Sequence, residues 1–367
     1  MGQNMRSIRV SIAFIVFILI SLGLVMIYSS SGTYAQQELG NSTYYLTRHF
    51  CFLWIGLFLT LGVMTMDYRQ LQPLAKPLLL VCIVLLVLVL IPGIGKSSFG
   101  ARRWFNFGPI NFQPSELTKL AMLIYVADFL SRKQNNIRDF LKGFLPLMFV
   151  LGLVCLLIVK QPDLGNSVLI GCITLIMMFI AGAQIKHVGS LMMLTLPVVY
   201  LLIARVPYRL ARITAFLKPW DDAQGAGFQL TQSQIALGSG GFFGIGLGKS
   251  VQKLFYLPAA HTDFILSILG EEMGLIGTLT VVFLFISFIW QGARIAKKTN
   301  DPFGHFLAIG IVAMLGLQAL VNIGVSIGAL PTKGLPLPFI SYGGSALIFN
   351  LMAVGLLLNI SRTEDLE

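Results

Sequence analysis

The chain has 367 residues, of which 56% are hydrophobic and only 11% are charged. A soluble domain of this length carries about 25% charged residues. The composition therefore excludes a soluble globular protein and indicates a polytopic membrane protein with a single domain over residues 1–367. The net charge of +11 is divided among many short loops, which argues against nucleic acid and favours anionic headgroups or an anionic substrate.

Ten apolar segments approach the roughly 20 residues that a helix needs to cross a bilayer. The expected helices cover residues 8–29, 49–66, 77–92, 114–131, 143–159, 166–182, 188–204, 264–290, 305–328 and 344–361. The first segment has no Ala-x-Ala cleavage site, so we expect a membrane span and not a signal peptide. The predicted fold class is all-α, with about ten transmembrane helices and one long extracytoplasmic loop at about 205–263.

The basic residues predict the orientation of these spans. With the N-terminus inside, the inner loops hold thirteen Lys and Arg residues and the short outer loops hold six. By the positive-inside rule, both termini are then cytoplasmic. Basic residues on the outer side run against this rule, and they cluster at 93–112 and 205–263. We expect them to serve a ligand there.

Several local patterns carry no functional prediction. The four cysteines lie in apolar segments without a Cys-x-x-Cys pair, and are interpreted as small buried hydrophobic residues. The stretch 244–250 resembles a phosphate-binding loop, but Phe243 occupies the position of its first glycine, so a mobile glycine-rich loop is expected. His261 and Asp263 have no nearby histidine or cysteine to complete a zinc site, and no metal ligands are predicted.

Asp263 stands where the long polar loop meets the next apolar helix. Partial desolvation at such a position raises the pKa of a carboxyl group and makes it a better base. The alternative is a structural role at the start of the helix, where an acid interacts favourably with the helix dipole. Position alone leaves both interpretations open.

A second group of charges opens the helix expected at 114–131. Pro114 suits the first turn of a helix, and Glu116 and Lys119 are spaced to meet on one face. Lys119 would lie about one turn inside the bilayer, where an unpaired charge is costly. We expect either an internal ion pair or a functional pair in which Glu116 orients Lys119.

Arg102 and Arg103 lie beside Trp104 at an expected outer interface. Guanidinium groups form bidentate, charge-assisted bonds with phosphate oxygens, so this pair is a candidate for holding a diphosphate. The alternative is an interfacial anchor of aromatic and cationic residues. In the turn after the 143–159 helix, Lys160 and Asp163 either serve the site or simply pair with each other.

Two stretches near the C-terminal half complete the set. Glu271 and Glu272 follow Asp263 by about two turns and are expected to pair with a basic partner, not to react. Residues 331–345 are rich in helix breakers. Such backbone is tolerated at membrane depth where it lines a cavity, so this stretch is either a re-entrant wall of the site or an ordinary outer loop.

Together these stretches resemble the SEDS family (shape, elongation, division and sporulation) of membrane peptidoglycan glycosyltransferases. The resemblance rests on Gly100-Ala-Arg-Arg-Trp104, Gln113-Pro-Ser-Glu116, Lys160-Gln-Pro-Asp163-Leu-Gly165, His261-Thr-Asp263-Phe264-Ile265, Gly270-Glu-Glu-Met-Gly274 and Leu335-Pro-Leu-Pro-Phe-Ile-Ser-Tyr-Gly-Gly344. These pieces occur in family order. The stretches 227–233, 248–253 and 331–336 look like the division branch, and sporulation relatives share much of the pattern. Ala259 departs from the family, which often has an acid there.

The resemblance implies a lipid II polymerase in the bacterial cytoplasmic (inner) membrane. Asp263 is the candidate catalytic base. The candidates for binding substrate and its diphosphate are Arg102, Arg103, Glu116, Lys119, Lys160, Asp163, Lys249, His261 and Lys333. No cofactor is firmly implied, although a divalent cation is compatible with a diphosphate. The implied partners are a class B penicillin-binding protein, which is a transpeptidase, and other division proteins.

Two rival functions fit parts of the same sequence. A lipid II flippase would also use many spans and an intramembrane Lys119, but the polar residues concentrate on one face of the membrane. A non-catalytic division scaffold would neither polymerise nor move lipid II. Polymerisation by an elongation-branch or sporulation-branch enzyme is a further alternative.

Overall fold

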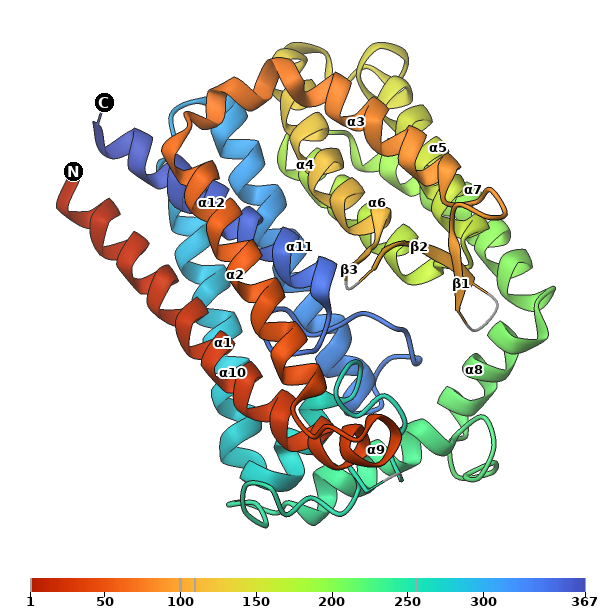
Figure 1. Cartoon of the computed structure of the whole chain (residues 1–367). Coiled ribbons are helices and arrows are strands. Elements are labelled where there is room, and N and C mark those ends of the chain that lie inside the picture. The colour runs from red at the N-terminus through yellow and green to blue at the C-terminus, as the bar shows by residue number, and fades with distance from the viewer. Residues whose placement is uncertain (1, 99–100, 109, 255, 367) are drawn as a thin grey trace.

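The structure is a computed structural model that describes residues 2–98, 101–108, 110–254 and 256–366 (Figure 1). Each of the ten expected segments is a helix. They are α1 (Gly2–Leu39), α2 (Tyr44–Thr65), α3 (Leu71–Leu88), α4 (Pro114–Arg132), α5 (Leu145–Lys160), α6 (Leu164–Ile180), α7 (Ile185–Ala204), α10 (Ile265–Lys298), α11 (Pro302–Ser326) and α12 (Gly344–Leu366). Short 3-10 helices at Tyr68–Gln70 and Gln134–Asn136 and a π-helix at Phe140–Phe144 precede some of them.

Seven of the described helices are long and apolar enough to cross a membrane, namely α1, α2, α3, α5, α10, α11 and α12. α6 is apolar but shorter, and α4 carries Glu116, Lys119 and Asp128 along its length. Large apolar side chains such as Phe58 and Phe149, which are 77% and 74% exposed, lie on the outer surface of the bundle. Surfaces of this kind require an apolar solvent, so the prediction of a helical integral membrane protein is confirmed.

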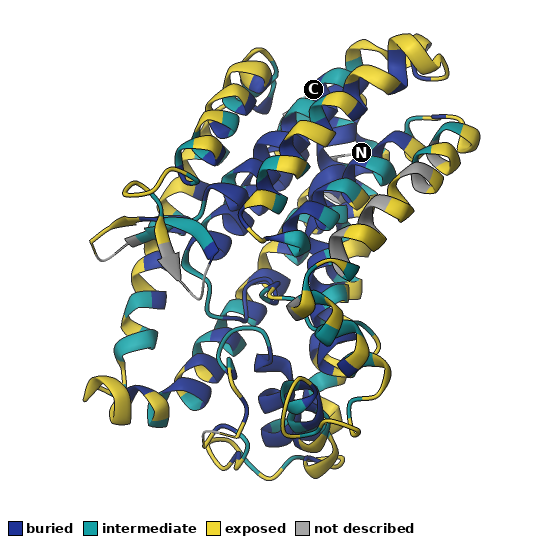
Figure 2. Ribbon diagram, turned by 90° about the vertical axis from the view of Figure 1, so that its right-hand side faces the viewer, coloured by how far each residue is buried: buried dark blue, intermediate teal, exposed yellow. Residues whose placement is uncertain are grey.

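The bundle is arranged around α12, which packs against α2, α1, α11 and α4. Figure 2 shows the buried residues concentrated in the interior of the bundle. α4 continues the core toward α3 and α6. Both termini lie at one end of the bundle (Figure 1). The opposite end, here called the loop end, carries the turn between α1 and α2 and the segments 240–264 and 331–343.

Residues 96–112 form a small antiparallel sheet where only a loop was expected. Its strands are β1 (Lys96–Ser98), β2 (Ala101–Phe107) and β3 (Ile110–Phe112), with β2 in the middle. Successive side chains on a strand point to opposite faces. The strand therefore separates Arg102 from Arg103, although the two are adjacent in sequence.

The long loop at 205–263 also contains helices, α8 (Pro207–Leu217) and α9 (Phe228–Ser239). After α9, the glycine-rich segment packs against α10. At this point α10 is broken at Gly274, whose φ is +69°. The amides of Leu275 and Ile245 donate to the carbonyls of Gly241 and Glu271, at 2.9 and 3.0 Å. The stretch expected to be a mobile loop is thus fastened to the broken helix, because the break frees backbone groups that the loop satisfies.

Replacing Gly274 by alanine is expected to destabilise the protein. Its positive φ disfavours a side chain, and an added Cβ would lie 2.4 Å from the Gly244 amide nitrogen and 2.5 Å from the Phe242 carbonyl oxygen. Backbone strain of this kind costs about 1–3 kcal/mol, so Tm in detergent should fall. Gly62→Ala is the control, because nothing lies within 4 Å of its Cβ. Equal Tm values for the two variants would contradict the expectation.

Candidate functional site

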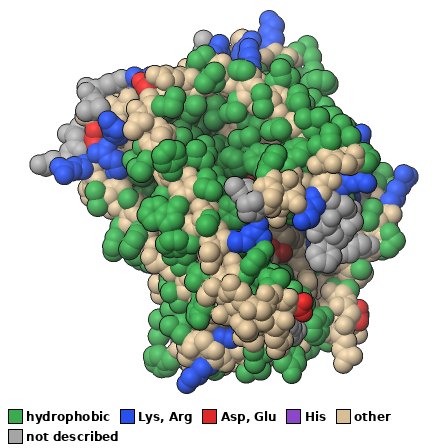
Figure 3. Space-filling view, in the orientation of Figure 1, with side chains coloured by type: hydrophobic (Ala, Val, Ile, Leu, Met, Phe, Trp, Pro, Cys, Tyr) green, Lys and Arg blue, Asp and Glu red, His purple; other side chains and the backbone are tan. Residues whose placement is uncertain are grey.

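A cavity of about 580 Å³ opens near the loop end and contains Asp263. Figure 3 shows a hollow on this side of the molecule, with basic and acidic side chains gathered around it below an apolar surface. Its wall is built from α2, the sheet, the starts of α4, α6 and α12, and the segments 259–263 and 334–343. The lining residues are Arg48, Phe52, Lys96, Arg103, Trp104, Asn111, Gln113, Glu116, Asn166, Ala259, Thr262, Asp263, Gly334, Pro336, Tyr342, Gly343, Gly344, Ser345 and Ala346.

The backbone around Asp263 is fixed by two neighbouring segments. The Asn322 side-chain amide, on α11, donates to the carbonyls of Asp263 and Leu335 at 2.8 and 2.9 Å. The Ser341 hydroxyl donates to the Thr262 carbonyl at 2.6 Å. Residues 331–345 are therefore a wall of the site and not an independent loop, which decides between the two alternatives left by the sequence.

The Asp263 carboxylate is directed to the cavity and not to the helix that follows. Phe264 is the residue that precedes α10, and no side chain caps this helix. A Cβ added at Gly334 would lie 3.3 Å from a carboxylate oxygen of Asp263, so the glycine leaves room beside the acid. Among the described residues the carboxylate accepts no hydrogen bond, which leaves its oxygens available to a ligand.

Burial raises the pKa of Asp263 to about 6, while the positive charges of Arg212 and Arg103 oppose the rise. The carboxyl group therefore takes up and releases a proton near pH 6. A general base works best when its pKa lies close to the working pH. Asp263 thus combines access to a cavity with the basicity required for proton abstraction.

Three basic side chains line the same cavity: Arg48 on α2, Lys96 on β1 and Arg103 on β2. Arg103 also donates from Nε to the Gln161 carbonyl at 2.9 Å and from a terminal nitrogen to the Pro162 carbonyl. These bonds hold the sheet against the turn between α5 and α6. The cavity therefore places an acid and several cations on one wall, an arrangement suited to an anionic substrate.

The start of α4 contributes a buried ion pair. Lys119 Nζ lies 2.7 Å from Glu116 Oε2, and each side chain is only 2% exposed. Glu116 lines the cavity, whereas Lys119 lies behind it. The pair expected from the spacing is present. In this geometry Lys119 neutralises Glu116, so the cavity wall at this point carries little net charge.

Asp163 supports the cavity from the side. Its carboxylate accepts from the Asn166 side-chain amide at 2.9 Å, from the Asn166 backbone N–H at 3.3 Å and from the Gln113 side-chain amide at 3.3 Å. Asn166 and Gln113 both line the cavity. Asp163 therefore caps α6 and positions two lining amides. Within the described residues it forms no ion pair with Lys160, which is exposed.

Several residues proposed from the sequence do not line the cavity. Arg102 is on the opposite face of β2 from Arg103, Lys160 is exposed, and Lys249 lies in the glycine-rich segment. Lys333 neighbours the lining residue Gly334, and burial lowers its pKa. His261 packs among Tyr34, Tyr45 and Tyr342, where burial lowers its pKa to about 4. None of these five lines the described cavity.

The sequence did not single out three cations that lie in or near this cavity. Arg48 and Lys96 line the cavity, and Arg212 acts on the pKa of Asp263. The available signal was their position on the outer side, where basic residues oppose the positive-inside rule. That signal marks a region of the sequence, and only the fold shows which of its side chains converge.

The donors near Asp263 do not form a resident metal site. Within the described chain, no group of three histidine, cysteine, aspartate or glutamate side chains is placed to hold an ion. Glu116 is the other carboxylate on the cavity wall, and it is already paired with Lys119. A Mg²⁺ ion that arrives with a diphosphate needs only one or two protein carboxylates, because waters and phosphate oxygens complete its coordination.

The loop that leads to Asp263 is anchored by two buried carboxylates of α10. Glu271 accepts the Ser250 hydroxyl and the Val251 amide, the latter at 3.0 Å. Glu272 accepts Lys253 Nζ at 2.8 Å and a hydroxyl from α1, that of Ser29, at 2.6 Å. The expected pairing with a basic residue holds for Glu272, whereas Glu271 binds a hydroxyl and backbone amides.

The chain belongs to the FtsW/RodA/SpoVE family, because the profile of this family, described as "Cell cycle protein", matches residues 9–366. Its relatives include a "Probable peptidoglycan glycosyltransferase FtsW" of Geobacter metallireducens, which is 48% identical over 92% of this chain and 90% of the relative. The "Stage V sporulation protein E" of Bacillus subtilis is 44% identical over 95% of each chain.

Two solved structures have the same fold. A chain from a structure described as "Structural coordination of polymerization and crosslinking by a peptidoglycan synthase complex" superposes with a TM-score of 0.79 at 29% identity, covering 96% of this chain and 97% of that one. The rod shape determining protein RodA of Thermus thermophilus gives a TM-score of 0.71 at 29% identity, covering 96% of each chain.

Replacing Lys253 by methionine is expected to lower the free energy of unfolding by about 3–5 kcal/mol, because Glu272 is left charged and buried without its cation. The double variant Lys253→Met, Glu272→Gln should lose less. Lys218→Met is the control, since its pair with Asp221 is largely exposed and such pairs contribute little. Chemical unfolding in detergent measures all three, and a single variant as stable as the control would refute the anchoring role.

Proposed function

We propose that this protein is a peptidoglycan glycosyltransferase of the division branch, which polymerises lipid II into glycan strands and releases polyprenyl diphosphate. The observation that carries the proposal is the placement of Asp263. Its carboxylate, with a pKa raised to about 6, lies in a cavity that also receives Arg48, Lys96 and Arg103. Family membership and relatives named as peptidoglycan glycosyltransferases support the same activity.

In the proposed reaction, Asp263 removes the proton from the 4-hydroxyl of one sugar. The resulting oxygen nucleophile attacks C1 of a second sugar, and the bond from C1 to the diphosphate oxygen breaks. The bonding electrons leave with the diphosphate. Arg48, Lys96 and Arg103 stabilise the charge that develops there, as fixed cations do in a site of low dielectric constant. A positioned base contributes about 10²–10⁴-fold to such a rate.

The proposal places the loop end of the bundle outside the cytoplasmic membrane and both termini in the cytoplasm. The excess of basic residues in the loops on the terminal side supports this orientation. Lipid II then enters the cavity from the outer leaflet, because its diphosphate lies at the membrane surface. We further propose a class B penicillin-binding protein as the partner that cross-links the product. The likeness to a chain of a peptidoglycan synthase complex supports this pairing.

Asp263→Asn should abolish polymerisation of purified lipid II, because the amide retains the shape of the side chain but cannot accept the proton. The product is measured as glycan polymer, with and without the transpeptidase partner. An unchanged Tm and membrane insertion serve as the control for folding. Polymerisation near the wild-type rate would remove Asp263 from the mechanism. If the wild-type protein moves lipid II between leaflets without making polymer, it is a flippase and not a polymerase.

The rate of polymerisation should depend on the ionisation of Asp263. The base acts in its deprotonated form, so kcat/KM should rise as the pH increases through about 6 and level off above it. Arg212 lowers the pKa of Asp263, so Arg212→Gln should move the midpoint to higher pH. Lipid II polymerisation between about pH 5 and pH 8 tests both statements. A flat profile for the wild-type enzyme would contradict the assignment.

A further inference from the structure

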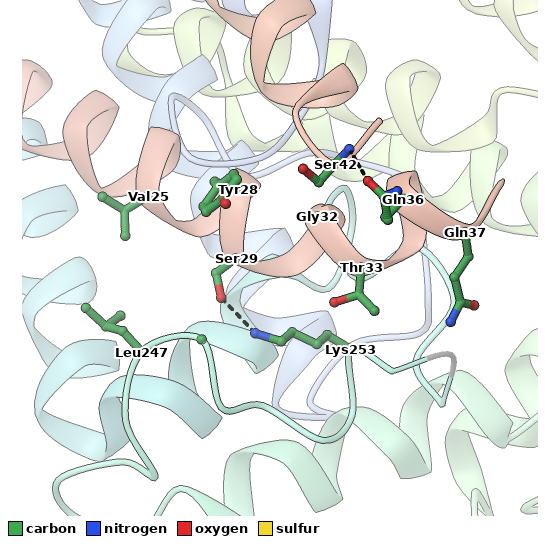
Figure 4. A pocket seen from close by; sticks show the side chains of 11 residues that line it. Val25, Tyr28, Ser29, Gly32, Thr33, Gln36, Gln37, Ser42, Leu247 and Lys253 are labelled. Carbon is green, nitrogen blue, oxygen red and sulfur yellow. Dashed lines mark hydrogen bonds between the residues drawn. The ribbon is translucent and has the colours of Figure 1, made fainter. Parts of the chain in front are cut away.

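A second cavity, of about 640 Å³, lies between α1 and the glycine-rich segment 247–253 (Figure 4). Its lining residues are Val25, Tyr28, Ser29, Gly32, Thr33, Gln36, Gln37, Ser42, Leu247, Gly248 and Lys253. It shares no lining residue with the cavity that contains Asp263. We call it the α1 groove.

The lining of the α1 groove is mainly apolar with some hydroxyl and amide groups, and its one cation is neutralised. Lys253 Nζ donates to Ser29 Oγ at 3.0 Å and to Glu272 at 2.8 Å. Its side chain is only 6% exposed, so the ion pair contributes little net charge to the groove. The remaining lining side chains are uncharged. A phosphate, which binds most strongly to basic side chains with free N–H groups, is therefore a poor occupant.

Hydroxyl and amide groups in the α1 groove are available to a ligand. Gln36 uses its carbonyl oxygen to accept the Ser42 amide at 3.1 Å, which leaves its NH₂ group. Thr33 and Gln37 make no side-chain hydrogen bond with any described residue, and both point into the open space in Figure 4. These groups supply both donors and acceptors. Tyr28 and Leu247 add exposed apolar surface at the other side of the groove.

A layer of aromatic side chains connects the α1 groove to the cavity of Asp263. Tyr34 follows the groove residue Thr33 and stacks on His261 with ring centroids 6.1 Å apart. His261 in turn contacts Tyr342 at 5.8 Å, and Tyr342 lines the catalytic cavity. The two cavities therefore lie on either side of one packed wall, so a polymeric ligand that leaves one has the other close by.

We propose that the α1 groove binds neutral N-acetylhexosamine units of the glycan strand, at a distance from the diphosphate. This inference rests on the proposed function. Sugar rings present neutral hydroxyl and amide groups together with an apolar face, which matches Thr33, Gln36 and Gln37 on one side and Tyr28 on the other. Holding the strand here would keep the product bound between successive additions, because binding remote from the reacting bond retains the chain.

Gly32 provides a way to fill the groove. It is helical, and an added Cβ would meet only the Ser42 carbonyl oxygen, at 3.7 Å, an ordinary contact. Gly32→Trp therefore extends an indole into the cavity. The matched control is Gly62→Trp, which adds the same side chain on the exposed face of α2 with nothing within 4 Å of its Cβ.

The test is binding of a soluble β-1,4-linked tetramer of N-acetylglucosamine to the full chain in nanodiscs, measured by saturation-transfer NMR. Wild type and Gly62→Trp should bind it equally. Gly32→Trp should weaken binding by about tenfold or more and, in the polymerisation assay, shorten the glycan strands.

Three results would overturn the proposal: no binding to wild type, equal binding by Gly32→Trp, or displacement of the tetramer by a short-chain phosphatidylglycerol, which would make the groove a phospholipid site. Binding is measured without turnover, so it is independent of catalysis. Tetramer binding by a wild-type protein that makes no polymer would refute the proposed function and leave the saccharide site standing.

Discussion

The position of the candidate base depends on two buried carboxylates that fasten a loop to a broken helix. Glu271 and Glu272 bind residues 250–253, and Lys253 carries this attachment to Ser29 on α1. Ten residues later the same chain enters the site as Asp263. In a medium of low dielectric constant, each of these carboxylates is tolerable only with its partners in place. The network therefore couples α1, α10 and the loop, while Asn322 and Ser341 fix the backbone at Thr262 and Asp263.

The buried acids of the bundle differ in whether a close basic partner neutralises their charge. Glu116 with Lys119 and Glu272 with Lys253 are close pairs, 2.7 and 2.8 Å apart, that add little net charge. Asp263 differs, because the cations near it lower its pKa without forming a close pair, while burial raises it to about 6. The same apolar surroundings thus make two acids structural and leave the third able to exchange a proton.

The two cavities at the loop end also differ in whether their basic residues are neutralised by a close acid. Around Asp263, the basic side chains of Arg48, Lys96 and Arg103 line the cavity, which suits an anionic leaving group. In the α1 groove the one lysine is neutralised, and what remains is apolar surface with some hydroxyl and amide groups. The aromatic layer of Tyr34, Tyr45, His261 and Tyr342 separates them. A lipid-linked saccharide has both an anionic and a neutral part, so this division matches its chemistry.

The sequence by itself determined the ten helices and singled out the junction at Asp263 as a candidate site. Apolar length and the cost of an unpaired charge in a membrane are local properties that a single chain reveals. It also indicated the ion pair of Glu116 and Lys119, because helical spacing fixes such neighbours. Only the tertiary structure decided that Arg103 faces the cavity while Arg102 does not. It also brought in Arg48 and Lys96 and placed His261 in an aromatic wall. Those outcomes depend on strand pairing and on contacts between segments far apart in the chain, which local patterns do not encode.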